Sequence, residues 1–161
     1  MITLVVLNWN GADDTLACLK SLGQMKGPTP NIIICDNHSS DDSFVRISRE
    51  LQSIAAQNRD YQFASLEINQ SLPPSILESA KAYLILVQTR ANLGFAGGVN
   101  VGLRLALQDP TMQFSWVLNN DTRVDPGALE ALLDTLTDQP RVGLCGSTLL
   151  IWMNRNGFRR W

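Results

Sequence analysis

The chain has 161 residues, of which 45% are hydrophobic and 17% charged, a balance that fits one globular domain with a substantial core. Its net charge of −2 argues against a broad nucleic-acid-binding surface, so we expect no nucleic-acid partner. Three widely spaced cysteines without a CxxC pair indicate reduced thiols and a cytoplasmic location, and we find neither a secretory signal nor an apolar stretch near the ~20 residues of a membrane helix.

The first part of the chain alternates predicted strands and helices. Residues 2–7 form a short apolar run typical of a strand buried on both faces, and 13–22 carry leucines at helical spacing behind two aspartates. A second buried strand is predicted over 31–35, followed by a polar turn and a helix whose apolar face spans 44–54. Residues 61–68 fit an edge strand, and a proline pair then opens a short helix.

The second part continues the alternation. Residues 83–87 predict a buried strand, and an apolar helical pattern runs over 99–108 after a glycine-rich loop. Further strands are expected over 114–118 and 142–145, on either side of a helix over 126–136. The chain therefore predicts an α/β fold, a Rossmann-like and mostly parallel sheet with helices on both faces.

The glycine-rich loop, residues 92–102, reads NLGFAGGVNVG and joins a strand to a helix. Glycine there lets the backbone approach a ligand closely, and the following helix directs free N–H groups and a partial positive charge back at the loop. An anion such as a diphosphate suits this position. Taken alone, a purely structural glycine-rich turn explains the loop better.

Four predicted strands end in polar or glycine-rich segments, which read LNWNG, DNHSSD, NLGFAGG and NNDTRVD. In open parallel α/β sheets, ligands bind outside the carboxyl ends of the strands. We therefore expect the four segments to meet at one edge of the sheet and to form a binding site there.

Asp121 is the candidate metal ligand in the last of these segments. A carboxylate after a buried strand suits Mg²⁺ or Mn²⁺, with substrate phosphate oxygens completing the coordination shell. The alternative is an aspartate that caps its own turn, and only the three neighbouring segments favour the metal. Asp125 precedes Pro126 and is expected to cap the following helix.

Asp36 ends the second strand, where it can accept from a ribose hydroxyl or a base N–H; a turn aspartate is the equal alternative. Ser39, Ser40 and Asp41 are expected to cap the next helix. His38 is the one histidine and is interpreted as an exposed turn residue. The sequence contains no Walker loop and no GxSxG nucleophile motif.

In this order, LNWNG (7–11), DNHSSD (36–41), NLGFAGGVNVG (92–102), LNNDTRVDPGALEALL (118–133) and GLCGSTLL (143–150) resemble family 2 glycosyltransferases, nucleotide-sugar-dependent enzymes with the GT-A fold. The second to fourth match the family patterns DNxSxD, NxGFAxGxNxG and LNPDT, and the rhamnosyltransferase-type members are most similar. The resemblance covers nearly the whole chain.

The resemblance implies a donor site and a metal pair. Three residues of the implied donor site also have a structural explanation. Trp9 is equally well explained as a packing aromatic, and Phe95 is better explained as a core residue. Asn100 alternatively bonds backbone groups within its own helix. The metal would be bound by Asp121 and Asn119, where asparagine replaces the first acid of the family's triplet. The residues that would line the nucleotide-sugar site are Asn8, Trp9, Asn10, Asp36, Asn92, Gly94, Phe95, Ala96, Gly98 and Asn100.

The implied reaction is transfer of a sugar from a UDP- or dTDP-sugar to a saccharide or lipid-linked acceptor, with inversion at the anomeric carbon. A divalent metal would offset charge on the leaving diphosphate, and a general base would take the acceptor's proton. The catalytic residues are unknown, because no residue of this chain matches the family's base.

Length is the main departure from the family. The chain ends soon after the GLCGSTLL segment, so we expect a nucleotide-sugar-binding domain over 1–150 and a divergent tail over 151–161. A fragment that binds the donor but lacks the acceptor half and the base is therefore the alternative function. We also expect the unusually long interval before Asn92 to form a surface excursion within 58–79.

Two features of the chain's end bear on its partners. Residues 151–161 carry Arg155, Arg159 and Arg160 and no acid, which suits either a solvated tail or peripheral contact with the inner face of a membrane. A sheet edge left uncovered by the short chain favours homodimerisation. A dinucleotide-dependent oxidoreductase is disfavoured, because the first strand is not followed by GxGxxG.

Overall fold

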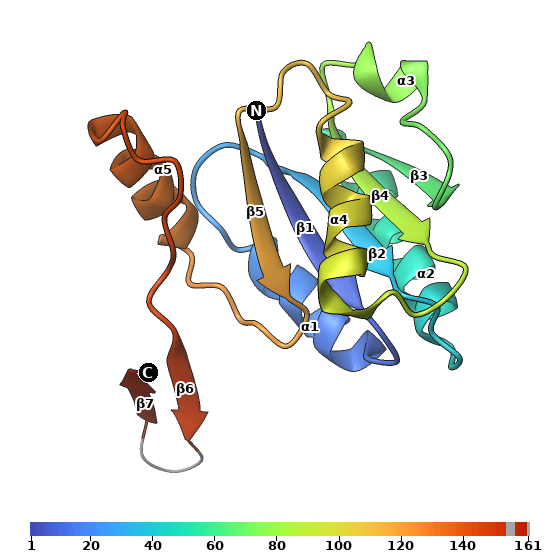
Figure 1. The fold of residues 1–161 in the computed structure, drawn as a ribbon, viewed down its shortest axis with the longest axis horizontal. Helices are drawn as coiled ribbons and strands as arrows, with labels where there is room; N and C mark the ends of the chain where they lie inside the picture. The colour runs from blue at the N-terminus through green and yellow to red at the C-terminus, as the bar shows by residue number, and fades with distance from the viewer. Residues whose placement is uncertain (154–156, 161) are drawn as a thin grey trace. The chain divides into compact units, whose positions relative to one another are not determined.

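The computed structural model describes residues 1–153 and 157–160, and the side chains of 151–161 lie outside that description (Figure 1). The expectations for the basic tail therefore stay predictions. The chain divides into two compact units, one formed by residues 1–20 and 28–123 and the other by 21–27 and 124–161. No helix of the described residues is long and apolar enough to cross a membrane.

The first unit is built on a sheet of five strands, all parallel, in the order β3-β4-β2-β1-β5. Branched apolar runs form the three central strands, whose residues are almost entirely buried because helices cover both faces. This confirms the predicted α/β fold. The strands are β1 (Ile2–Asn8), β2 (Asn31–Asp36), β3 (Tyr61–Glu67), β4 (Ala82–Gln88) and β5 (Phe114–Asn119).

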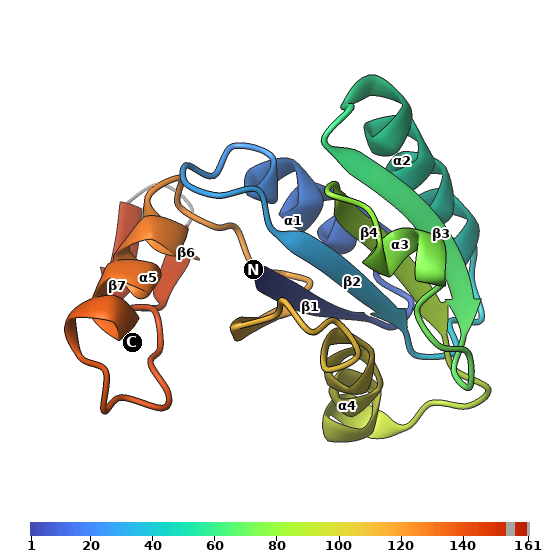
Figure 2. The same ribbon diagram turned by 90° about the horizontal axis from the view of Figure 1, so that it is seen from above.

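Helices lie on both faces of this sheet, with α4 on one face and α1 and α2 on the other (Figure 2). The core beneath α4 includes Val5, Ile33, Ile85 and Val101, and on the opposite face Ile47 and Leu51 of α2 are fully buried. The helices are α1 (Ala12–Leu22), α2 (Ser43–Gln57), α3 (Pro74–Leu77) and α4 (Gly94–Ala106).

Two glycines one turn apart let α4 pack directly on the sheet. A Cβ at Gly98 would lie 2.3 Å from Leu7 Cδ1, and one at Gly102 would lie 2.5 Å from Val5 Cγ1 and 2.8 Å from Cys35 Sγ. Neither position has space for a side chain. These two glycines therefore hold the helix against β1 and β2.

The segment 58–79 is not the surface excursion that we expected. Within it, β3 pairs with β4 along its whole length, and three of the segment's side chains, Leu66, Leu72 and Ile76, are buried in the core beneath α4. The polar appearance of the segment reflects the exposed face of an edge strand. It contributes a strand and part of the core.

The second unit contains α5 (Ala128–Asp138) and an antiparallel pair, β6 (Leu150–Met153) and β7 (Gly157–Arg160). Asp125 Oδ1 accepts from Gly127 N (2.8 Å) in the turn before α5, but the N-cap of this helix is Gly127, so the prediction that Asp125 caps it is wrong. The strand predicted over 142–145 is wrong. That short run belongs to the irregular stretch between α5 and β6, Leu144 is 90% exposed, and no strand of the described residues pairs with it.

A polar cluster, buried except for Thr111, lies at the amino ends of the central strands. Asn31 Oδ1 accepts from Tyr83 N (3.1 Å), Asn31 Nδ2 donates to Asp109 Oδ2 (3.3 Å), and Asp109 Oδ1 accepts from Thr111 N (2.9 Å) and Thr111 Oγ1 (2.7 Å). The Tyr83 hydroxyl lies 3.5 Å from Thr3 Oγ1. Burial raises the pKa of Tyr83 to about 12. These five residues satisfy one another, and we call them the amino-end cluster.

Candidate functional site

The carboxyl ends of the central strands lie level with one another. Asn8 is opposite Asp36, Asp36 is opposite Gln88, and Leu7 is opposite Asn119 in the register of the sheet. The four segments predicted to form a site therefore begin at one edge, as the parallel topology requires. We call this the carboxyl edge.

Asp36 is the buried centre of this edge. Its side chain is fully buried, and its Oδ1 accepts from Asn8 Nδ2 (2.8 Å) and Ser39 Oγ (2.5 Å). Its Oδ2 accepts from Ser39 N (3.1 Å) and from Gln88 Nε2, which at 3.4 Å is the longest of the four contacts. Asp36 is thus more than a local turn residue, because it joins three loops. A ligand that binds this carboxylate must replace one of its present partners, and Gln88 is the weakest held.

The loop after β1 is tied to the loop after β2. Asn10, which has a φ of +50°, donates from its backbone N to Ser39 Oγ (2.9 Å) and accepts from Ser40 N at its Oδ1 (2.8 Å). The two serines therefore bind the neighbouring loop, and the prediction that they cap α2 is wrong. Asp41 Oδ1 accepts from Ser43 N (3.0 Å) in the turn that leads into α2, but the N-cap of that helix is Asp42, so Asp41 does not cap it either.

Two aromatic side chains of the edge are open to solvent. Trp9 and Phe95 are each 56% exposed, and Leu93 is 42% exposed. The interpretations of Trp9 as a packing aromatic and of Phe95 as a core residue are therefore wrong. Both offer apolar faces beside the polar centre, where a ring of a ligand can stack.

The glycine-rich segment is the beginning of α4, which starts at Gly94 and not at Val99. Asn37, a buried residue that sequence reasoning did not select, holds this start in place. Its Nδ2 donates to Asn92 Oδ1 (2.9 Å) and Gly94 O (3.1 Å), and its Oδ1 accepts from Leu93 N (3.0 Å). Glycine is required at 94, where φ is +69°.

The remaining predicted residues of this helix divide into two groups. Ala96 and Asn100 are exposed, as are Asn92 and Gly94, and all four are open to a ligand. Gly98 is buried against Leu7 and Asn37, so its place in the packing already explains why a glycine stands there.

The turn after β5 carries the candidate metal ligands. Asn119 and Asp121 are both exposed, and Asn120 between them donates from Nδ2 to Gly11 O (3.2 Å) and Thr15 Oγ1 (3.1 Å). Burial raises the pKa of the nearby Cys18 thiol to about 11; the Arg123 cation opposes this shift and the Asp121 carboxylate adds to it. In this environment Cys18 is therefore a neutral thiol.

The side chains at this turn determine which kind of metal ion it could bind. Among the residues that the structure describes, no group of three or more His, Cys, Asp or Glu side chains could hold a metal ion. Asp121 and Asn119 supply oxygen atoms only. Mg²⁺ commonly keeps several waters and takes one or two protein oxygens together with substrate phosphates. The pair fits a hard cation that binds with a phosphate ligand and does not fit a closed protein cage.

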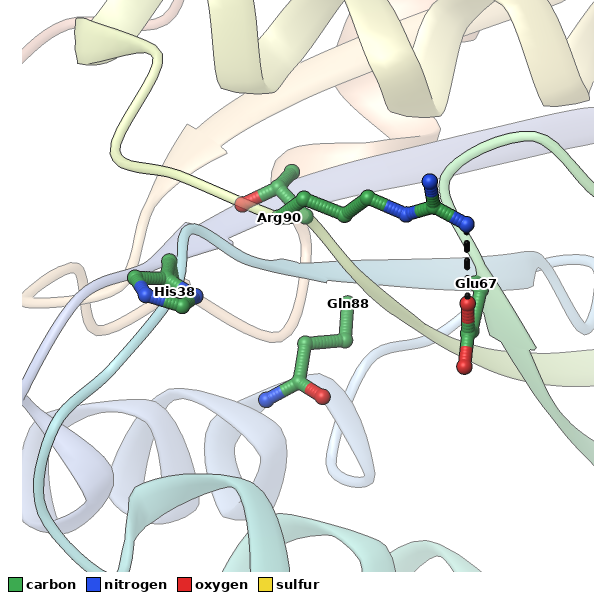
Figure 3. A pocket seen from close by; sticks show the side chains of 5 residues that line it. His38, Glu67, Gln88 and Arg90 are labelled. Carbon is green, nitrogen blue, oxygen red and sulfur yellow. Dashed lines mark ion pairs between the residues drawn. The ribbon is translucent and has the colours of Figure 1, made fainter.

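A pocket of about 330 Å³ has five lining residues, and the fully buried Asp36 is bonded to two of them, Gln88 and Thr89. Figure 3 shows Arg90 extending to Glu67, with their charged groups 3.6 Å apart, while His38 and Gln88 line the same pocket. Thr89 completes it, and its hydroxyl donates to Asp36 O (3.2 Å). Sequence reasoning missed Glu67, Gln88 and Arg90. Gln88 could have been found from the expected alignment of the strand ends.

Comparison with known proteins identifies the family of this chain. The sequence pattern described as glycosyl transferase family 2 matches residues 68–160, more than half of the chain. The chain belongs to glycosyl transferase family 2. The matched region includes the glycine-rich start of α4 and the turn from Asn119 to Asp121. No curated protein matches the chain.

Solved structures support the same assignment at the level of fold. The chain is similar to TarS of S. aureus with a TM-score of 0.57 and 13% identity, covering 86% of this chain and 20% of that one. For TarS residues 1–349 the TM-score is 0.55 and the identity 16%, covering 86% of this chain and 33% of that one. The expected GT-A fold is confirmed, and this family member spans a third or less of the structures that it matches.

Proposed function

We propose that this chain binds a nucleotide-diphosphate sugar at the carboxyl edge and serves in transfer of the sugar to an acceptor hydroxyl. One observation carries the proposal: Asp36, the start of α4 and the Asp121 turn follow strands that end level, and hydrogen bonds join their loops. Membership of family 2 supports glycosyl transfer as the reaction.

The nucleoside is assigned to the pocket beside Asp36. A volume of about 330 Å³ suits a base or a ribose, and pockets of this size commonly hold small ligands. Gln88 exchanges its long contact with Asp36 for one with the ligand, which leaves Asp36 Oδ2 to accept from a ribose hydroxyl or a base N–H. The exposed faces of Trp9 and Phe95 are available for stacking.

The diphosphate is assigned to the start of α4. The exposed first turn has no side chain at Gly94 to block it, and the helix dipole favours an anion there; the Gly94 N–H itself already donates to Asn92 Oδ1 (2.8 Å). Asp121 and Asn119 would hold Mg²⁺ or Mn²⁺ with the phosphate oxygens. When bound, the metal stabilises the negative charge that develops on the leaving diphosphate.

The acceptor is a saccharide or lipid-linked hydroxyl, which attacks the anomeric carbon with inversion while the nucleoside diphosphate leaves. We assign no general base. A second candidate function is donor binding without transfer. The chain spans a third or less of the two TarS structures described above, so their whole activity is not carried over to it.

Titration calorimetry tests the binding proposal. UDP-sugars and dTDP-sugars are titrated into the protein with and without Mn²⁺, and NADH serves as the control ligand. We expect one nucleotide sugar to bind, more tightly with Mn²⁺, and NADH not to bind. Asp121→Ala should abolish the effect of Mn²⁺, whereas Glu50→Gln, an exposed acid on α2, should retain it. Binding of no nucleotide sugar would refute the proposal, and a turnover assay with the bound donor separates transfer from binding alone.

A further inference from the structure

A chain of hydrogen bonds crosses beneath the carboxyl edge and joins the two acidic positions of the site. Asn8 Nδ2 donates to Asp36 Oδ1 (2.8 Å), Thr15 Oγ1 donates to Asn8 Oδ1 (2.8 Å), and Asn120 Nδ2 donates to Thr15 Oγ1 (3.1 Å). Asp36, Asn8 and Thr15 are fully buried. Asn120 is half-buried and immediately precedes Asp121.

The direction of each bond in this chain is fixed. A carboxylate only accepts, so the amide nitrogen of Asn8 faces Asp36 and its oxygen faces Thr15. The single Thr15 hydroxyl proton must then go to Asn8, which leaves a lone pair for Asn120. Asn120 in turn presents its NH₂ group, which also donates to Gly11 O (3.2 Å). One orientation of all four side chains satisfies the chain.

The packing around Asn120 enforces the same arrangement. A Cβ at Gly11 would lie 2.7 Å from Asn120 Nδ2, so glycine leaves the space that this amide occupies. Thr15 lies one turn into α1, and its backbone N donates to Gly11 O (3.0 Å). The turn after β5 is therefore fastened to the first turn of α1 and not only to its own strand.

We propose that Thr15 is a positioning residue whose hydroxyl couples the Asp36 side of the site to the turn that carries Asp121. This inference rests on the proposed function. Because the bonds of this chain share one satisfied orientation, a ligand that holds Asp36 in place disfavours the states in which Asn120 and its turn are released. Binding of the nucleotide at Asp36 and of the metal at Asp121 should therefore strengthen each other by the same factor.

The test compares Thr15→Val, which keeps the shape of the side chain but loses the hydroxyl, with Thr15→Ser, which keeps the hydroxyl. Calorimetry gives the affinity for UDP with and without Mn²⁺, and the ratio of the two measures the coupling. We expect Thr15→Val to lower this ratio at least about fivefold, the lower range of known couplings, and Thr15→Ser to retain it. A wild-type ratio in folded Thr15→Val would overturn the proposal.

A second measurement keeps the inference testable if Thr15→Val does not fold or if UDP does not bind. Native-state amide exchange is followed at Thr122 N, which donates to Asn119 O within the turn (3.2 Å), and at Tyr83 N in the amino-end cluster as reference. Asn120→Ala removes the same hydrogen bond, between Asn120 and Thr15, by changing the partner that is only half-buried. We expect it to speed exchange at Thr122 about two- to tenfold, the factor of one hydrogen bond, and to leave Tyr83 unchanged.

The two measurements separate the possible failures. If UDP does not bind but Thr122 exchange responds to Asn120→Ala, the proposed function fails, and with it the coupling, and only the structural link between Asn120 and its turn stands. If UDP binds with a Mn²⁺ effect that neither Thr15→Val nor Asn120→Ala changes, the donor site stands and the positioning role is wrong. Unchanged exchange at Thr122 in folded Asn120→Ala also refutes the positioning role.

Discussion

The two ends of the central sheet both contain a buried asparagine bonded to an aspartate, and they differ in what surrounds that pair. At the amino end, Asn31 and Asp109 are bonded to residues of their own cluster, of which Thr111 alone is exposed. At the carboxyl end, Asn8 and Asp36 are bonded to loops with exposed groups, and Asp36 is bonded to Gln88 and Thr89, which line a pocket. Buried polar groups alone thus do not distinguish the two ends; the neighbouring pocket does.

The largest expected effect comes from isosteric changes at these two aspartates. Asp36→Asn places an NH₂ group against a donor, so it should cost about 1–3 kcal/mol of unfolding free energy and weaken nucleotide binding at least about tenfold. Asp109→Asn should cost stability alone. Urea unfolding and calorimetry on both variants check this. Equal loss of nucleotide affinity in the two variants would remove the distinction between the ends of the sheet.

The next effect concerns the packing of α4 behind the carboxyl edge. Gly102→Ala should lower the unfolding free energy by about 1–3 kcal/mol, because the new methyl group overlaps Val5 and Cys35. Gly146→Ala is the control, because a Cβ there meets no atom within 4 Å. Urea midpoints measure both. A neutral Gly102→Ala would mean that the helix does not sit as close to β1 and β2 as the structure places it.

A smaller effect is expected in the pocket. Arg90 and Glu67 form an exposed ion pair, with 74% and 69% of their side chains accessible, and such pairs contribute little to stability. Arg90→Gln should therefore leave the urea midpoint unchanged while weakening nucleotide binding about threefold, since a cation beside an anionic ligand is lost. Arg49→Gln, on the exposed surface of α2, is the control variant. Equal nucleotide affinity in wild type and Arg90→Gln would place the nucleoside outside this pocket.

The smallest effect is a pH dependence beneath the carboxyl edge. Burial raises the pKa of the Cys18 thiol from 9.0 to about 11, so the folded protein holds this proton more tightly than the unfolded chain does. Its contribution to stability is present in full below pH 9 and is lost as the pH rises toward 11. Urea midpoints from pH 8 to 10.5 should therefore fall less in Cys18→Ala than in wild type. Parallel curves would contradict the burial of this thiol.

Much of the fold could be predicted because its signals are local. Branched apolar runs mark β1, β2 and β4, and parallel strands must bring their carboxyl ends together, which placed Asp36 and Asp121 at one edge. The start of α4 could not be predicted, because glycines interrupt the apolar helical spacing of the sequence, whereas tertiary contacts stabilise a helix there. The strand predicted over 142–145 was wrong because its composition suits a strand, but no strand of the described residues pairs with it.

The site was predicted less completely than the fold. Asp36 and Asp121 were selected from the strand ends and Asn8 from the family resemblance, whereas Thr15 and Asn37 are bonded to residues that are distant from them in sequence or lie in other loops. Glu67 reaches the pocket only because β3 pairs with β4, and no local pattern specifies that register. Contacts between loops, and not residue types, decide which polar groups remain free for a ligand.

The most direct test of the central claim is a titration with UDP and Mg²⁺ followed by amide chemical shifts. The account predicts that the amides of Ser39, Gly94 and Thr122, from three different loops, shift together with one dissociation constant, while those of Tyr83 and Thr111 in the amino-end cluster stay in place. Separate dissociation constants for the three loops, or equal shifts at both ends of the sheet, would contradict a single nucleotide site at the carboxyl edge.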